Sequence, residues 1–122
     1  MFNIEFYQDK SGSEPIVEYI RGLNAKAQTS KDHRIRHKKI IEYLEVLSNF
    51  GTRAGEPYVK HIDSDIWELR PTNDRIFFFY WKEETYLMLH HYIKKTQKTP
   101  AREIEQAKRN LADFLERSGH NE

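Results

Sequence analysis

A group of arginines, lysines and histidines between Trp67 and Lys98 contains the residues of this sequence best suited to chemistry. They are joined by one well-placed tyrosine, and the set is Arg70, Arg75, His90, His91, Tyr92, Lys94, Lys95 and Lys98. A guanidinium group matches phosphate bidentately and stabilises the charge that grows on its oxygens during reaction. Histidine is poised near neutrality to accept or donate a proton. These residue types therefore predict a phosphodiester site, provided that the fold brings them to one surface.

A β-hairpin is the element that must position them. Strand-like segments at 75–81 and 86–93 flank Glu83-Glu84. A connecting loop of two or four residues makes Arg75 face Tyr92 and Phe77 face His90, and it makes Phe79 face Met88. A three-residue loop would change these cross-strand partners.

Alternation along the strands assigns each side chain to a face of the sheet. One face is expected to carry Arg75, His90, Tyr92 and Lys94, flanked by Phe77 and Phe79. Arg70 joins this face from a strand that closes at Pro71, in which Trp67 and Leu69 point the other way while Glu68 shares the side of Arg70. The opposite face is more aliphatic and is expected to lie under helices, although His91 also falls on it. Its other members are Ile76, Phe78, Leu87, Leu89 and Ile93.

Helical spacing of apolar residues and end signals predict three helices. The first is expected to be capped by Ser13 and to end at Gly22 and Asn24. The second runs from Asp32 to Gly51, and the third follows Thr99-Pro100. An alternating strand at 2–6 precedes them, and a short strand is expected at 59–62. The order predicts a single α+β domain over residues 1–122, with an antiparallel sheet, helices packed on one face and a C-terminal helix.

The composition excludes several classes of function but does not identify one. The chain has 122 residues, a net charge of +1 and no cysteine, which excludes disulfides and thiolate metal sites and makes the cytoplasm the default compartment. No run approaches the roughly 18 apolar residues of a membrane span, so no membrane partner is expected. Nucleotide-binding glycine loops and metalloprotease motifs are absent, and His90 and His91 point to opposite faces, so neither a cofactor nor a metal is predicted.

Ordinary structural interpretations compete with the chemical one. Glu68 could simply pair with one of the arginines, and the FFFYW run is typical of a core. The basic segment at 31–39 reads as a solvated helix start, or alternatively as a surface for ribosomal RNA or DNA phosphate. These alternatives stay open on the residues alone.

The order of four segments, PYVKHI, IWELRP, DRIFFFYW and LHHYIKKTQKTPAREIEQA, resembles the RelE/HigB-type toxins of bacterial toxin–antitoxin pairs. It is most similar to the phage-related HigB-like branch, over residues 51–112. The resemblance implies a compact RelE-like fold. It also implies a ribosome-dependent mRNA endonuclease that inhibits translation and cleaves without a metal, by attack of the RNA's own 2′-hydroxyl.

The resemblance also implies residue roles. It assigns phosphate and transition-state contacts to Arg70 and Arg75, and RNA-backbone contacts to Lys94, Lys95 and Lys98. Lys60 and His61 of PYVKHI are expected to bind RNA as well. Proton transfer remains open between His90 and Tyr92, with Lys94 as a further candidate, because the usual carboxy-terminal tyrosine of RelE-type toxins has no clear equivalent here.

The partners that the resemblance implies are mRNA on the ribosome, ribosomal RNA, and a HigA-like helix-turn-helix antitoxin. Promoter DNA would be bound only through the antitoxin complex, and the first two helices are the expected antitoxin-docking surface. A different class of function fits the same residues: a non-catalytic module that binds nucleic acid or a partner. A toxin-fold protein with another ribosomal or replication target is a third interpretation.

Overall fold

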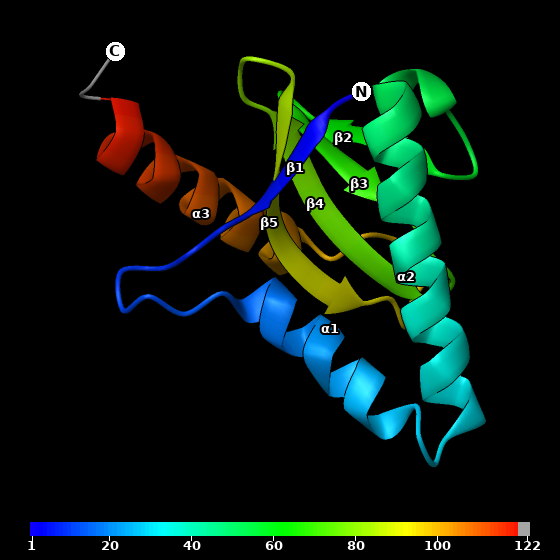
Figure 1. Ribbon diagram of the computed structural model, residues 1–122. Helices are drawn as coiled ribbons and strands as arrows, with labels where there is room; N and C mark the ends of the chain where they lie inside the picture. The colour runs from blue at the N-terminus through cyan, green and yellow to red at the C-terminus, as the bar shows by residue number, and fades with distance from the viewer. Residues whose placement is uncertain (120–122) are drawn as a thin grey trace.

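A five-stranded sheet organises residues 1–119, the part of the chain that the computed structural model describes (Figure 1). Its strand order is β1-β5-β4-β3-β2. Strand β1 pairs with β5 in parallel, and the other neighbouring strands are antiparallel. The strands are β1 (Asn3–Phe6), β2 (Val59–Asp63), β3 (Ile66–Leu69), β4 (Asp74–Tyr80) and β5 (Thr85–Ile93).

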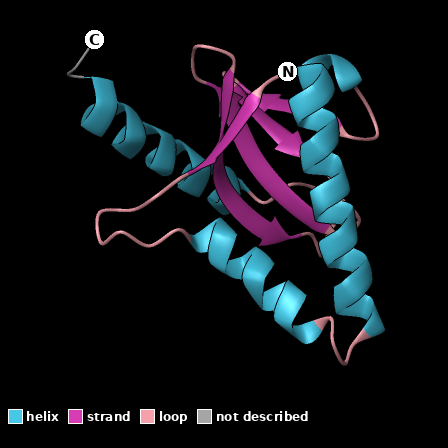
Figure 2. Cartoon of the chain, in the orientation of Figure 1, coloured by secondary structure: helices cyan, strands magenta, loops and turns pink. Residues whose placement is uncertain are grey.

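Helices cover both faces of this sheet (Figure 2). The helical elements are α1 (Pro15–Lys26), α2 (Lys31–Phe50), the 3₁₀ turn η1 (Gly51–Ala54) and α3 (Ala101–Gly119). Helices α1 and α2 lie on one face, whereas α3 crosses the other. The predicted α+β class and C-terminal helix are confirmed. Two details of the prediction are wrong: helices pack on both faces of the sheet instead of one, and β1 pairs in parallel in an otherwise antiparallel sheet.

Local signals explain where the helices begin and end. The Ser30 hydroxyl accepts a hydrogen bond from the backbone N–H of His33, and so caps α2. Gly51 ends α2 at φ 63°, as predicted. Helix α1 differs from the prediction because it continues through Gly22 to Lys26, and because the hydroxyl of Ser13 binds Glu18 instead of capping the helix.

Two apolar cores result, one on each face of the sheet. Beneath α1 and α2, the buried side chains of Ile16, Leu23, Ile40 and Leu47 pack on Leu69, Ile76, Phe78 and Met88. On the α3 face, Ala107 packs on Ile66, Phe77, Phe79, Leu87, Leu89 and Tyr92. Aromatic residues thus fill both sides of the central strands, which is why so short a chain can cover both faces.

A β-bulge in β5 changes the predicted register halfway along the hairpin. The pairs Arg75 with Tyr92 and Phe77 with His90 form as predicted, but the next partner of β4 is Met88, which faces Phe78. Leu89 is the extra residue, so the predicted pairing of Phe79 with Met88 is wrong.

Because of the bulge, some side chains lie on a different face of the sheet from the one predicted. Ile76 and Phe78 do lie under α1 and α2, but Leu87 and Leu89 lie on the α3 face, and Met88 takes their predicted place. Ile93 is largely exposed. Because the bulge lies beyond the rung formed by Phe77 and His90, the rung of Arg75 and Tyr92 keeps its predicted orientation.

Candidate functional site

A groove of about 420 Å³ lies on the α3 face, between the edge strand β2 and the segment that leads into α3. Lys60 of β2 and Glu68 of β3 are cross-strand partners in its wall. Four cations line the groove, namely Lys60, Arg70, Lys94 and Lys98, with His61, Glu68 and Thr99 beside them. Cations outnumber carboxylates here, so the groove attracts an anion even though the whole chain is almost neutral.

A buried carboxylate, that of Glu68, forms the centre of the site. The residue is 1% exposed, and one of its carboxylate oxygens, Oε2, accepts a hydrogen bond from the Tyr92 hydroxyl at 3.1 Å. The other oxygen, Oε1, lies 3.5 Å from Nε of Arg70 and 3.9 Å from Nε of Arg75. Both Nε atoms are buried and have no hydrogen-bond partner among the described residues. The negative charge of Glu68 therefore holds the two guanidinium groups close together, although neither buried Nε–H forms a hydrogen bond with it.

The guanidinium of Arg75 is fixed by the turn that precedes β4. Its Nη1 donates to the carbonyl of Thr72 at 2.7 Å and to that of Asp74 at 2.9 Å. The side chain is 11% exposed. Burial lowers the pKa of Arg75, the neighbouring Arg70 charge lowers it further, and Glu68 opposes both effects. Arg75 nevertheless stays charged at neutral pH, because arginine does not lose its proton in proteins.

This environment raises the pKa of Tyr92 and lowers the pKa of Lys94. Burial is the main cause that raises the pKa of Tyr92 to about 12, and the Glu68 carboxylate adds to it. The phenol therefore stays protonated at neutral pH and acts as a donor. The pKa of Lys94 is lowered, first by desolvation and then by the charges of Arg75 and Arg70, which makes its ammonium a better proton donor than an ordinary lysine.

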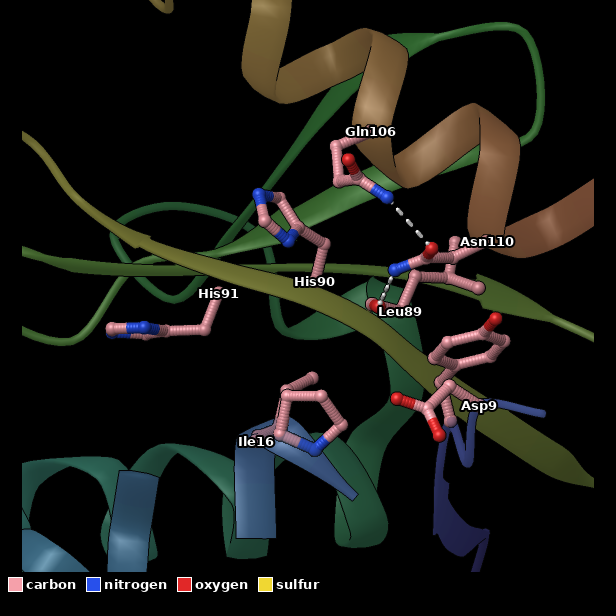
Figure 3. Close-up of a pocket in the computed structure, with 9 residues that line it drawn as sticks. Asp9, Ile16, Leu89, His90, His91, Gln106 and Asn110 are labelled. Carbon is pink, nitrogen blue, oxygen red and sulfur yellow. Dashed lines mark hydrogen bonds between the residues drawn. The ribbon is translucent and has the colours of Figure 1, made fainter. Parts of the chain in front are cut away.

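The two adjacent histidines point to opposite faces, as predicted, and neither lines the groove. The Nε2 of His90 lies 2.7 Å from Glu103 Oε1, and the Nε2 of His91 lies 2.9 Å from Asp74 Oδ1. Both residues border a different cavity, of about 420 Å³, between α3 and the start of α1. Figure 3 shows His90 on the α3 side of β5, near Gln106, and His91 on the other side.

The predicted residues are thus brought together only in part. Lys60, His61, Arg70, Lys94 and Lys98 line the groove. Arg75 and Tyr92 reach it through Glu68, to which both lie close. His90 does not line the groove, and Lys95 is exposed outside its lining.

The aromatic flank was predicted wrongly. Phe77 is fully buried and Phe79 is 6% exposed, both within the core beneath α3. Neither ring is available to flank a surface site or to stack a base. The bulge does not cause this burial; α3 covers the face that the sequence had left open.

Glu68 is the functional candidate that reasoning from sequence undervalued. The alternation that places Trp67 and Leu69 on the opposite face also puts Glu68 beside Arg70, so a signal for its position existed. What the sequence did not carry is its burial among three donors, because a glutamate in a strand is ordinarily solvent-exposed.

Neither a metal-binding group of side chains nor a membrane-spanning helix is found among the described residues. Within residues 1–119, no three or more His, Asp and Glu side chains form a group that could hold a metal ion. None of the helices in the same range has both the length and the apolarity to cross a membrane.

Comparison with known proteins identifies a family for this chain. The family model described as "Phage derived protein Gp49-like (DUF891)" matches residues 18–112, from within α1 to within α3. The match includes all the groove residues named above. No curated protein matches the chain at a significant level. The family is associated with RelE/HigB-type toxin–antitoxin systems, which confirms the resemblance at that level but not the HigB branch itself. Since the model covers most of the sequence, the chain belongs to the family of phage-derived Gp49-like proteins.

Proposed function

We propose that this protein is a ribosome-dependent mRNA endonuclease, a toxin that inhibits translation in the cytoplasm and is neutralised by a HigA-like helix-turn-helix antitoxin. The observation that carries the proposal is the cationic groove built around buried Glu68. The family match adds to it, because Gp49-like proteins are associated with toxin–antitoxin systems.

The groove suits a phosphodiester for two reasons. Lys60 and Lys98 line its walls, and with His61 and nearby Lys95 they would contact the RNA backbone and ribosomal RNA. Arg70 lines the groove with a guanidinium group suited to a phosphate oxygen, and the charge of Arg75 lies beside it across Glu68. Guanidinium contacts of this kind strengthen as charge develops on the phosphate in the transition state.

The reaction would use the RNA's 2′-hydroxyl as nucleophile. In the proposed mechanism the Glu68 carboxylate accepts the 2′-hydroxyl proton, and the 2′-oxygen forms a bond to phosphorus. The bond from phosphorus to the 5′-oxygen then breaks, and Lys94 protonates that oxygen. The products are a 2′,3′-cyclic phosphate and a 5′-hydroxyl end, and no metal takes part in these steps.

Tyr92 and His90 are less suited to proton transfer than Glu68 and Lys94. Tyr92, with its pKa raised to about 12, would hold the Glu68 carboxylate in place through its hydroxyl. His90 receives no role in this mechanism, since its ring is held by Glu103 and lines another cavity.

The experiment is primer extension on a defined mRNA in a purified translation system, with and without ribosomes. Arg70→Ala and Arg75→Ala should each lower the cleavage rate on the order of a hundredfold, as expected for loss of one transition-state contact. Arg109→Ala is the matched control, because Arg109 is an exposed arginine of α3 outside the groove. Intact mRNA with the wild-type protein, or equal cleavage by all three variants, would refute the proposal.

One observation favours a second function. Arg75 and Tyr92 are both mostly buried and already hydrogen-bonded within the chain, which is as expected of structural groups as of catalytic ones. The alternative is a non-catalytic module whose groove binds RNA. A deoxynucleotide at the cut position separates the two functions, because it removes the nucleophile. RNA binding should survive this substitution for either function. If the protein is an enzyme, the cleavage measured with the all-RNA substrate should disappear; a binding module shows no cleavage of either substrate.

A further inference from the structure

The turn at 71–74, between β3 and β4, holds two cations of the groove through its backbone. The carbonyls of Thr72 and Asp74 both accept hydrogen bonds from Nη1 of Arg75. The carbonyl of Asn73, between them, accepts the backbone N–H of Lys94 at 2.8 Å. Three consecutive carbonyls therefore fix the guanidinium of Arg75 and the backbone position of Lys94.

This turn has a backbone conformation that needs support. Thr72 has φ 47°, a left-handed conformation that β-branched residues rarely adopt. Such a conformation persists only where its surroundings determine it strongly. One support is the hydrogen bond from the Asp74 N–H to the Pro71 carbonyl, at 2.9 Å, which closes the turn.

The stronger support comes from the Asp74 side chain, on the opposite face of the sheet. The carboxylate is fully buried and accepts hydrogen bonds from three elements. The donors are the Tyr19 hydroxyl of α1 at 2.7 Å, Nε and Nη2 of Arg36 in α2 at 3.2 and 3.0 Å, and Nε2 of His91 in β5 at 2.9 Å.

These partners are also packed against one another. The rings of Tyr19 and His91 stack with their centroids 3.8 Å apart, and Nη2 of Arg36 donates to the Tyr19 hydroxyl. Asp74 is therefore tied to both helices of the covered face and to the neighbouring strand. A side chain held from three directions leaves its own backbone little freedom to move.

We propose that Asp74, held by Tyr19, Arg36 and His91, is a positioning residue that sets the orientation of Arg75 and the place of Lys94 in the groove. Its side chain and its carbonyl act on opposite faces of the sheet, so the network under α1 and α2 fixes the geometry of a site that it does not touch. The expected effect on cleavage rests on the proposed function. The expected effect on the positions of Arg75 and Lys94 rests on geometry alone.

A purely structural role explains the network less well. A buried ion pair contributes little net stability compared with apolar residues of similar volume, because both charges lose their hydration. What such a network does provide is a defined arrangement of its members. Here that arrangement reaches the groove through the carbonyls of the turn.

The test combines a structural and a catalytic measurement on the full chain. Asp74→Asn keeps the shape of the side chain but removes its charge, and His91→Leu removes one donor. His91→Gln, which keeps an N–H donor, is the conservative rescue. The control is Tyr7→Phe, which removes a different, part-buried hydrogen bond, from the Tyr7 hydroxyl to Asp113 at 2.5 Å. Neither residue is among the hydrogen-bond donors to the Asp74 carboxylate.

Two NMR signals report the structural part: the Nε–H resonance of Arg75 and the backbone amide of Lys94. Both should shift in folded Asp74→Asn and His91→Leu, stay near their wild-type positions in His91→Gln, and be unchanged in Tyr7→Phe. If Asp74→Asn does not fold, Tyr19→Phe makes the same test with a milder change. Unshifted resonances in a folded network variant would overturn the inference.

Single-turnover cleavage on programmed ribosomes reports the catalytic part. A small misplacement of a catalytic group costs up to about a hundredfold in rate. Asp74→Asn and His91→Leu should therefore cleave between about tenfold and about a hundredfold more slowly, with little change in the half-saturating concentration, whereas His91→Gln should stay near the wild-type rate. A loss that merely follows the folded fraction, as in the control, would overturn the inference. If the wild type cleaves nothing, the proposed function fails, while shifted resonances would still support the positioning role.

Discussion

Replacing Asp74 by Asn should change how the stability of this protein depends on pH. Burial alone would raise the pKa of Asp74, but the hydrogen bonds from His91, Arg36 and Tyr19 outweigh it and hold the pKa at about 2, against an ordinary value of 3.8. A carboxyl group whose pKa is lower in the folded state stabilises that state above its unfolded pKa. The stabilisation is lost as the pH falls from about 4 towards 2.

The magnitude follows from the size of the depression. At about 1.4 kcal/mol for each pKa unit, lowering the pKa from 3.8 to about 2 corresponds to about 2 kcal/mol in the free energy of unfolding. At neutral pH the variant loses more than this, because Arg36 stays mostly buried with only the exposed Asp32 as an acidic partner. Removing one member of a buried ion pair costs about 3–5 kcal/mol.

The assay is urea unfolding of wild type and Asp74→Asn at a series of pH values between 7 and 2. The gap between their free energies of unfolding should narrow by about 2 kcal/mol between pH 4 and pH 2, since only the wild type has this carboxylate to protonate. Asp63→Asn is the control, because Asp63 forms a solvent-exposed pair with Lys108 that contributes little. A gap that stays constant with pH would refute the account of the Asp74 network.

Three further changes test the packing. Leu89→Ala removes a fully buried side chain at the bulge and should lower the free energy of unfolding by about 2–5 kcal/mol in chemical denaturation; an unchanged midpoint would contradict its place in the α3 core. Gly51→Ala should lower the melting temperature, because its Cβ would lie 2.8 Å from Phe2 and from the Tyr86 hydroxyl at a φ of 63°; melting at the wild-type temperature would contradict that close contact. Ser30→Ala removes the α2 cap and should cost about 0.5–2 kcal/mol, whereas Ser30→Gly should cost less.

The sequence predicted the elements well because their signals are local. Helix α2 ends at its glycine, and the rung of Arg75 and Tyr92 forms as alternation requires. The bulge at Leu89 was missed because no glycine or proline marks it in LMLHHY. A single extra residue then reversed the faces of Leu87 and Met88, since the period of a strand is two.

The candidate site was predicted less completely, for a different reason. The cations of the site could be predicted because arginine and lysine are positively charged wherever they occur in the sequence. Its acids could not, because the burial of Glu68 and Asp74 depends on donors that arrive from elsewhere in the chain. Arg36, for example, belongs to a basic run that reads as solvated, yet it is the member that reaches back to Asp74.

Away from the bulge, adjacent residues of a strand point to opposite faces of the sheet. This alternation connects the face under α1 and α2 with the groove on the α3 face. Asp74 and Arg75 are neighbours, as are His91 and Tyr92, and in each pair one side chain joins the network under α1 and α2 while the other lies beside Glu68. A strand cannot move one member of such a pair without moving the other. On the proposed positioning role of Asp74, we expect a partner that shifts α1 or α2 to change the position of Arg75 without entering the groove. If the expected antitoxin docks on these helices, it need not cover the groove to silence it.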